Sequence, residues 1–112
     1  MSKSPKKNKI AISVGDINGI GIELALNTHE TIKDLCTPIY CINKKLLKKA
    51  ALKLKIKVPK DFKTHNTQGN FKIKKGRVSK KSGQFSYDSF IDAITLTKNE
   101  QTKALVTLPI NK

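Results

Sequence analysis

Short apolar runs rich in β-branched residues alternate along this chain with longer segments in which apolar residues recur at helical spacing. Three runs predict strands: 9–14, 38–42 and 103–108. Three segments predict helices: 20–33, 44–55 and 82–98. Because strands alternate with helices, the pattern predicts a partial three-layer α/β/α fold with mostly parallel strands.

The helix predicted at 44–55 has the clearest pattern. Asn43 is a suitable N-cap. Its apolar stripe consists of Leu46, Leu47, Ala50 and Leu54, and lysines occupy the other faces. A basic amphipathic helix is also compatible with a membrane surface or a calmodulin-like partner. The plainer interpretation is a helix packed on the sheet, with lysine stems covering its solvent side.

The other two helices are expected to bury their larger apolar residues. In the last helix these have i, i+3, i+4, i+7 spacing: Tyr87, Phe90, Ile91 and Ile94. Ser82 or Ser86 is its expected N-cap. In the first helix, Ile20, Leu24 and possibly Leu26 fall near one face, with Glu23 in the first turn. The stretch from 58 to 83 is loop-like, with a possible short strand at 71–74.

The length of 112 residues suits one domain. We expect a basic flexible tail at 1–8 and an α/β unit at 9–112. The apolar runs are too short for a transmembrane helix, and no signal-peptide pattern follows the basic start, so the expected location is the cytoplasm. Cys36 and Cys41 lack the spacing of a redox or zinc motif and are expected to be free thiols.

The net charge of +15 raises an alternative function, a small basic module that binds nucleic acid or another polyanion. All the basic residues except Arg77 are lysines, whereas base readout and bidentate phosphate contacts favour arginine. The lysines are also spread over several segments, and no RNA-binding aromatic motif is present. A solvated basic surface is therefore the main interpretation, and nucleic-acid binding the alternative.

In parallel α/β sheets, ligands bind where the loops leave the carboxyl ends of the strands. Two such loops carry glycine-rich or polar residues: Gly15–Gly21 and Asn111–Lys112. The first is neither a dinucleotide fingerprint nor a P-loop, because it lacks the last glycine of one and the Gly-Lys-Ser/Thr of the other. It is compatible with an anion at the following helix N-terminus, or with a tight turn that only connects strand to helix. Asp16 is suited to orient a cationic or hydroxyl group, or to cap the helix.

The remaining polar residues favour structural roles. His29 and His65 are isolated, with no second ligand at metal spacing, and His29 is expected at the surface. The segment 79–83 is expected to be a mobile surface loop rather than a phosphate contact. The residues predict no Ser/His/Asp or Cys/His arrangement.

Three motifs resemble those of the 4-hydroxythreonine-4-phosphate dehydrogenases. The segment 10–23 is similar to their strand followed by Gly-Asp-Pro-x-Gly-Ile-Gly-Pro-Glu. The segment 82–87 resembles their Ser-Gly-x-x-Ser-Tyr helix start, and 104–112 their Ala-Leu-Val-Thr-x-Pro-Ile-Asn-Lys. The motifs occur in the family's order, and the resemblance runs from about 10 to 112 with a divergent middle.

The resemblance implies NAD-dependent oxidation of 4-phosphohydroxy-L-threonine with a divalent metal such as zinc, followed by loss of carbon dioxide, in pyridoxal 5′-phosphate biosynthesis. It also implies part of a fold like that of isocitrate and isopropylmalate dehydrogenases, and a homodimer with sites at the subunit interface. A metal there would polarise the substrate hydroxyl.

Ile17 and Ile22 replace two prolines of the family's first motif. The family's metal-binding histidines, its His-Thr substrate loop and its nicotinamide-binding segment match no residue of this chain. We therefore expect an N-terminal portion of the enzyme, inactive alone, with no metal or cofactor bound. No catalytic residue is assigned, and the cleft-side candidates are Asp16, Gly19, Gly21, Asn111 and Lys112.

Overall fold

The computed structural model describes residues 8–15, 21–69 and 80–108. Its elements are, in chain order, β1 (Lys9–Ser13), α1 (Gly21–Ile32), β2 (Thr37–Cys41), α2 (Lys44–Leu54), β3 (Lys63–His65), α3 (Lys80–Lys98) and β4 (Ala104–Thr107). The tail and the strand expected at 71–74 lie outside the described residues, apart from Asn8. Within those residues, no helix is long and apolar enough to cross a membrane.

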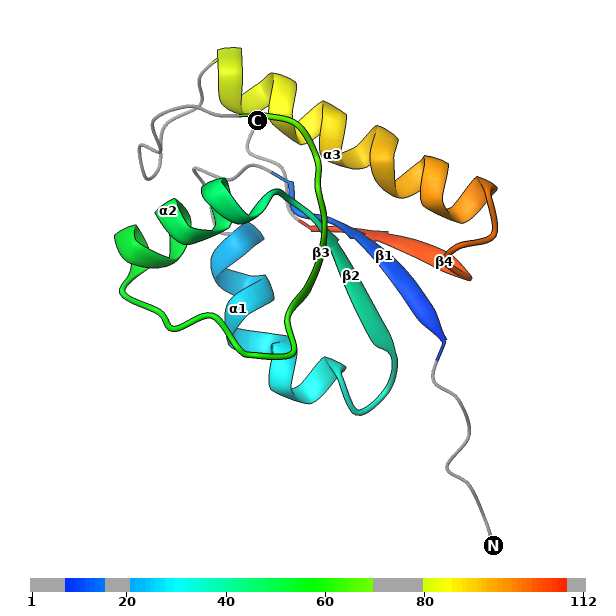
Figure 1. Cartoon of the computed structure of the whole chain (residues 1–112), viewed down its shortest axis with the longest axis horizontal. Helices are drawn as coiled ribbons and strands as arrows, with labels where there is room; N and C mark the ends of the chain where they lie inside the picture. Colours follow the sequence, from blue (N-terminus) through cyan, green and yellow to red (C-terminus); the bar gives the residue numbers. More distant parts are fainter. Residues whose placement is uncertain (1–7, 16–20, 70–79, 109–112) are drawn as a thin grey trace, which may run out of the picture.

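The four strands form one parallel sheet in the order β3-β2-β1-β4. Helices α1 and α2 lie together on one face, and α3 crosses the other face (Figure 1). The predicted three-layer α/β/α architecture is therefore confirmed. The sequence pattern missed β3, because a strand of three residues, Lys63–His65, is too short to show a period.

The strand pleat divides the core into two clusters. Alternate residues of the central strands, such as Ile12 and Tyr40, join α1 and α2 in the larger cluster. Ala11 and Cys41 point to the opposite face, where they pack against Ala93 and Leu96 of α3. Neither Cys36 nor Cys41 forms a disulfide, as expected.

Helix α2 forms as its sequence predicts. The Asn43 side chain accepts a hydrogen bond of 2.9 Å from the backbone N–H of Leu46, which satisfies one of the free donors of the first turn. The apolar stripe faces the core, with Leu46, Leu47 and Ala50 buried and Leu54 partly buried. This helix therefore covers the sheet, as the plainer interpretation requires.

Helix α3 buries a different face from the predicted one. Tyr87 is 60% exposed and Ile91 38% exposed, and Phe90 and Ile94 are only partly buried. The residues buried on this helix are mainly small: Ser82, Phe85, Ser86, Ser89, Ala93 and Leu96. Small side chains let the helix approach the sheet closely, and Tyr87 and Ile91 are left on its exposed side.

Three further expectations are wrong. Helix α3 begins at Lys80, so Ser82 and Ser86 are inside the helix and neither is its N-cap. For the same reason residues 80–83 do not form a surface loop; Ser79 lies outside the described residues. In α1, Leu24 is 41% exposed, because the buried face is instead formed by Ile22, Ala25, Leu26 and His29.

Candidate functional site at the carboxyl edge of the sheet

The chain changes direction across the sheet after β3. From β1 it proceeds to β2 and β3 on one side, and it then returns through α3 to place β4 on the other side of β1. In open α/β sheets, ligands bind outside the carboxyl ends of the strands at such a switch point. The carboxyl ends of β1 and β4 are therefore the candidate site of this fold.

The two loops singled out by the sequence leave from this point. Ser13 and Thr107 are register partners at the ends of β1 and β4, and the Leu108 N–H donates a 2.9 Å hydrogen bond to the Ser13 carbonyl. Gly15 has a φ of 67°, a left-handed conformation that favours glycine and turns the chain out of the strand. The topology thus brings together the starts of two loops that are about 90 residues apart in sequence.

Only one of the five candidate residues lies in the described part of the chain. Gly21 is the first residue of α1 and is buried. Asp16, Gly19, Asn111 and Lys112 lie outside the described residues. Their assignment to the cleft remains a prediction. It is based on the position of the strand ends that precede them in the chain.

Ser89 of α3 holds the strand ends in place, and the sequence analysis missed it. Its Oγ accepts a 3.1 Å hydrogen bond from the Val14 N–H and donates a 2.7 Å hydrogen bond to the Cys41 carbonyl. One buried hydroxyl therefore joins β1, β2 and α3 just before the glycine loop. The available signal was the helical spacing of Ser82, Ser86 and Ser89, which are all buried on α3, whereas only Ser82 and Ser86 were considered, as N-caps.

Ser13 adds a second buried hydroxyl at this edge. Its side chain has no exposed area, and its Oγ has no hydrogen-bond partner among residues 8–15, 21–69 and 80–108. A buried hydroxyl normally has a partner, because removing it from water costs free energy. Ser13 Oγ is therefore a described polar group of this edge that retains hydrogen-bonding capacity.

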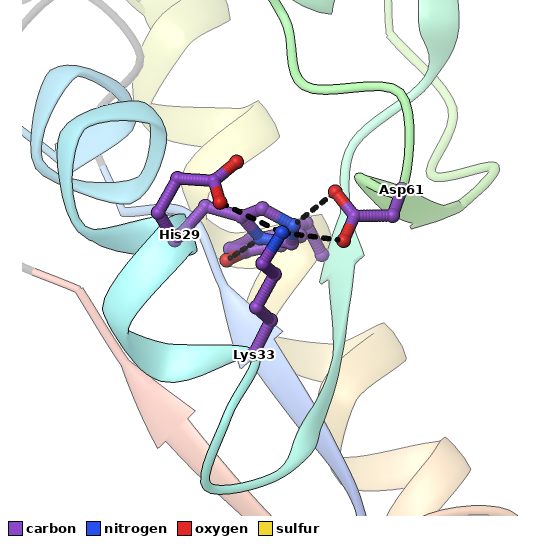
Figure 2. A network of polar contacts seen from close by, with 5 residues as sticks. His29, Lys33 and Asp61 are labelled. Carbon is purple, nitrogen blue, oxygen red and sulfur yellow. Dashed lines mark hydrogen bonds and ion pairs between the residues drawn. The ribbon is translucent and has the colours of Figure 1, made fainter.

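His29 is not at the surface, contrary to expectation. Its side chain lies on the buried face of α1 and is fully buried. The centroids of the His29 and Phe62 rings are 5.1 Å apart, so the two rings are in contact. Its Nδ1 lies 2.9 Å from the Tyr40 hydroxyl and its Nε2 3.0 Å from Asp61 Oδ1 (Figure 2). The signal was its position seven residues after Ile22, on the buried face of the helix.

Hydrogen bonding and burial shift the pKa values of two groups in this network. The hydrogen bond from His29, followed by that from Lys33, lowers the pKa of Asp61. Burial raises the pKa of Tyr40, so its hydroxyl remains protonated at neutral pH. The network joins the last turn of α1 to the segment before β3. We interpret it as a structural element rather than a catalytic one.

Cys41 and His65 are register partners at the carboxyl ends of β2 and β3. His65 Nε2 lies 3.5 Å from Asp92 Oδ2, which places a thiol, an imidazole and a carboxylate in one region. Burial, with a smaller effect of Asp92, raises the pKa of Cys41 to about 12. The thiol is therefore protonated at neutral pH and is a poor nucleophile.

A metal of the kind implied by the resemblance does not fit the described residues. Among them, no group of three His, Cys, Asp or Glu side chains is arranged to hold a metal ion. His29 is already engaged by Tyr40 and Asp61, and His65 by Asp92.

Comparisons with known proteins agree with one family. The family model described as "Pyridoxal phosphate biosynthetic protein PdxA" matches residues 34–112. The 4-hydroxythreonine-4-phosphate dehydrogenase of Campylobacter fetus subsp. fetus is 60% identical over 104 residues, which cover 93% of this chain and 34% of the relative. That of Sulfurimonas denitrificans is 50% identical over 106 residues, which cover 95% of this chain and 34% of the relative.

A solved structure agrees on the fold. The crystal structure of a 4-hydroxythreonine-4-phosphate dehydrogenase from Burkholderia phymatum superposes with a TM-score of 0.79 at 20% identity, covering 95% of this chain and 37% of that one. The chain thus spans about a third of the length of the curated relatives it matches. These matches do not favour the nucleic-acid-binding alternative.

Proposed function

Because this chain belongs to the family of pyridoxal phosphate biosynthetic protein PdxA, we propose that it contributes to the NAD-dependent oxidation of 4-phosphohydroxy-L-threonine. The observation that carries the proposal is the 60% identity to a relative named as the dehydrogenase, along nearly the whole chain. In the proposed reaction the carbon that bears the substrate hydroxyl passes a hydride to NAD⁺, and the hydroxyl proton passes to a base, so that a carbonyl forms. The 2-amino-3-oxo acid then loses carbon dioxide.

The part we assign to this chain is one wall of the substrate cleft, at the carboxyl ends of β1 and β4. Helix α1 begins at Gly21, after the strand that ends at this edge, and a helix N-terminus favours a phosphate or carboxylate. Lys112 is suited to contact the same anion, and Asp16 to accept a hydrogen bond from a substrate hydroxyl or ammonium group. Gly19, Gly21 and Asn111 would shape the loops around it.

We further propose that catalysis needs segments which the relatives possess outside the matched third of their length. These would supply the divalent metal site and the nicotinamide site, since the described residues do not fit a metal. The metal, when bound, would act as a Lewis acid on the substrate oxygen. The complete enzyme would be a cytoplasmic homodimer, and the 112-residue chain alone would be inactive.

A chimera tests the proposal directly. Residues 9–112 would replace the matched segment of the C. fetus enzyme, and NADH formation would be followed with 4-phosphohydroxy-L-threonine, NAD and Zn²⁺. We expect kcat/KM within about tenfold of the parent, because 60% identity preserves the fold and the loops. A folded, dimeric chimera that forms no NADH would contradict the proposal.

Two single-residue variants of the chimera assign the cleft. Lys112→Ala should raise KM for the phosphorylated substrate by about tenfold, the effect of one lost charge-assisted contact. Lys98→Ala, which removes an exposed lysine from the end of α3, is the matched control and should leave KM unchanged. The 112-residue chain tested alone should form no NADH, and turnover by it would refute the proposed inactivity.

A further inference from the structure

An open apolar groove lies along α2. It has a volume of about 520 Å³ and lies between the helix and the segment that returns from its C-terminus. Its lining residues are Lys44, Leu47, Lys48, Ala51, Leu52, Lys55, Ile56, Lys57 and Val58. In Figure 1 these correspond to α2 and the first part of the connection from α2 to β3.

The helix C-terminus builds the second wall of this groove. Lys55 has a φ of 57°, and its N–H donates to the Leu52 carbonyl, while the Ile56 N–H donates to the Ala51 carbonyl at 3.0 Å. This is a Schellman motif, which folds the following residues back over the last turns of the helix. Ile56 and Val58 thereby complete an apolar floor with Leu47 and Ala51.

Leu52 makes this floor unusual, because its side chain is 70% exposed at the groove. A single exposed leucine is common on protein surfaces. Here it continues an apolar floor that already lies in a concavity, so a partner side chain inserted there would be removed from water on several sides. The groove therefore has the form of a pocket for an apolar anchor.

The rim of the groove is entirely cationic. Lys44 and Lys48 lie one helical turn apart on α2, and Lys55 and Lys57 stand on the opposite wall. All four are exposed, and no acidic residue lines the groove. Lys55 also occupies the left-handed position where glycine is favoured, and so adds an ammonium group at a backbone cost.

We propose that this groove binds an acidic amphipathic peptide segment of a partner protein. One or two large apolar side chains would insert beside Leu52, and carboxylates on both sides of them would meet the lysines of the two walls. Charge complementarity provides the orientation and the apolar floor provides the affinity. This inference concerns a surface outside the cleft and does not depend on the proposed reaction.

Other occupants fit the groove less well. A second copy of the chain carries a net charge of +15, so two such rims would repel each other. Nucleic acid would meet an apolar floor without an aromatic side chain on which bases stack. A lipid surface favours protruding apolar side chains inserted together, whereas this site is concave and exposes one leucine.

The test uses the ¹⁵N-labelled 112-residue chain and a synthetic probe. The probe is a 16-residue helical peptide with leucines at i, i+3, i+4 and i+7 and glutamates at most other positions. A scrambled peptide of the same composition controls for attraction to a basic protein. Amide shift changes at 150 mM salt should be confined to residues 44–58, and the scrambled peptide should bind about tenfold more weakly.

Three variants separate the apolar and ionic parts. Leu52→Ser should weaken binding of the designed peptide by about tenfold, because the peptide would bury the exposed leucine side chain and the serine offers less apolar area. Lys48→Glu should weaken binding by a similar factor, whereas Lys98→Glu, the same charge reversal on α3, should change it less than about twofold. Lys55→Gly should weaken binding while raising the unfolding temperature, a combination that a purely structural residue would not give.

Several results would overturn the proposal. Equal affinity for both peptides, or shifts spread over all lysine-rich surfaces, would indicate non-specific attraction. Leu52-dependent dimerisation without peptide would assign the groove to a second copy. Leu52-dependent binding to phosphatidylcholine vesicles containing phosphatidylglycerol, without peptide binding, would assign it to a membrane.

Discussion

His29 Nε2 lies 3.0 Å from Asp61 Oδ1, so a buried imidazole of α1 contacts a half-exposed carboxylate 32 residues later in the chain. A carboxylate only accepts hydrogen bonds, and Nε2 must therefore carry a proton. In the neutral ring, Nδ1 is then the acceptor for the Tyr40 hydroxyl, 2.9 Å away. One tautomer satisfies both contacts and fixes how α1 sits on β2.

Replacing this imidazole should destabilise the fold. In His29→Ala, the Tyr40 hydroxyl loses its partner and a cavity opens beside Phe62, so we expect a loss of about 2–4 kcal/mol in the free energy of unfolding. Urea denaturation at pH 7 measures it. His65→Ala is the matched control, because His65 is 40% exposed and should cost less than about 1 kcal/mol. Equal losses in the two variants would contradict the structural role of His29.

The same network should contribute to the acid sensitivity of the chain. Because the pKa of Asp61 is lower in the folded state, its stabilising effect is complete above the unfolded pKa and is lost as the pH falls through the folded pKa. Asp61→Asn should therefore lose less stability than the natural chain between pH 5 and pH 2, a range set around the ordinary aspartate pKa of about 3.9. Urea denaturation across this range measures the difference. An equal loss of unfolding free energy in both chains between pH 5 and pH 2 would argue against a contribution from Asp61.

Ser89 provides a test of the packing at the carboxyl edge. Ser89→Ala leaves the Val14 N–H and the Cys41 carbonyl without their buried partner, which should cost about 1–3 kcal/mol. Amide exchange of Val14, the residue after β1, should accelerate more than that of the β1 amides. Thr95→Ala removes an exposed hydroxyl that bonds to its own helix, and should change stability by less than about 0.5 kcal/mol. Unchanged Val14 exchange would show that the Ser89 contact does not hold this edge.

Two glycines should respond to alanine in opposite directions. Gly69 has a φ of 152°, and an added Cβ would lie 2.6 Å from Phe85 Cδ1, so Gly69→Ala should destabilise by about 1–3 kcal/mol. At Gly83, inside α3, an added Cβ meets nothing within 4 Å. Gly83→Ala should therefore stabilise by about 0.5–1 kcal/mol. Thermal unfolding of both variants tests the sign, and two changes of the same sign would contradict the argument.

Local sequence patterns correctly predicted α2, whose larger apolar side chains form its buried face. Asn43 and the stripe of α2 predicted its start and its buried face correctly, because a capping side chain and a 3.6-residue period are properties of the segment itself. The same kind of pattern predicted the wrong buried face for α3, because that face is mostly serine and alanine. A period in apolar size does not reveal that a helix will approach a sheet through small side chains.

The sequence by itself determined the α/β class, most element positions, the glycine turn after β1 and the family resemblance, since all of these depend on residues close together in the chain. The tertiary structure decided that β4 lies beside β1, which places Ser13 and Thr107 next to each other and joins two distant loops. It also decided that His29 is buried, because its partners Tyr40 and Asp61 come from separate segments. Such contacts depend on strand order, and strand order is set by the packing of the whole sheet rather than by any local pattern.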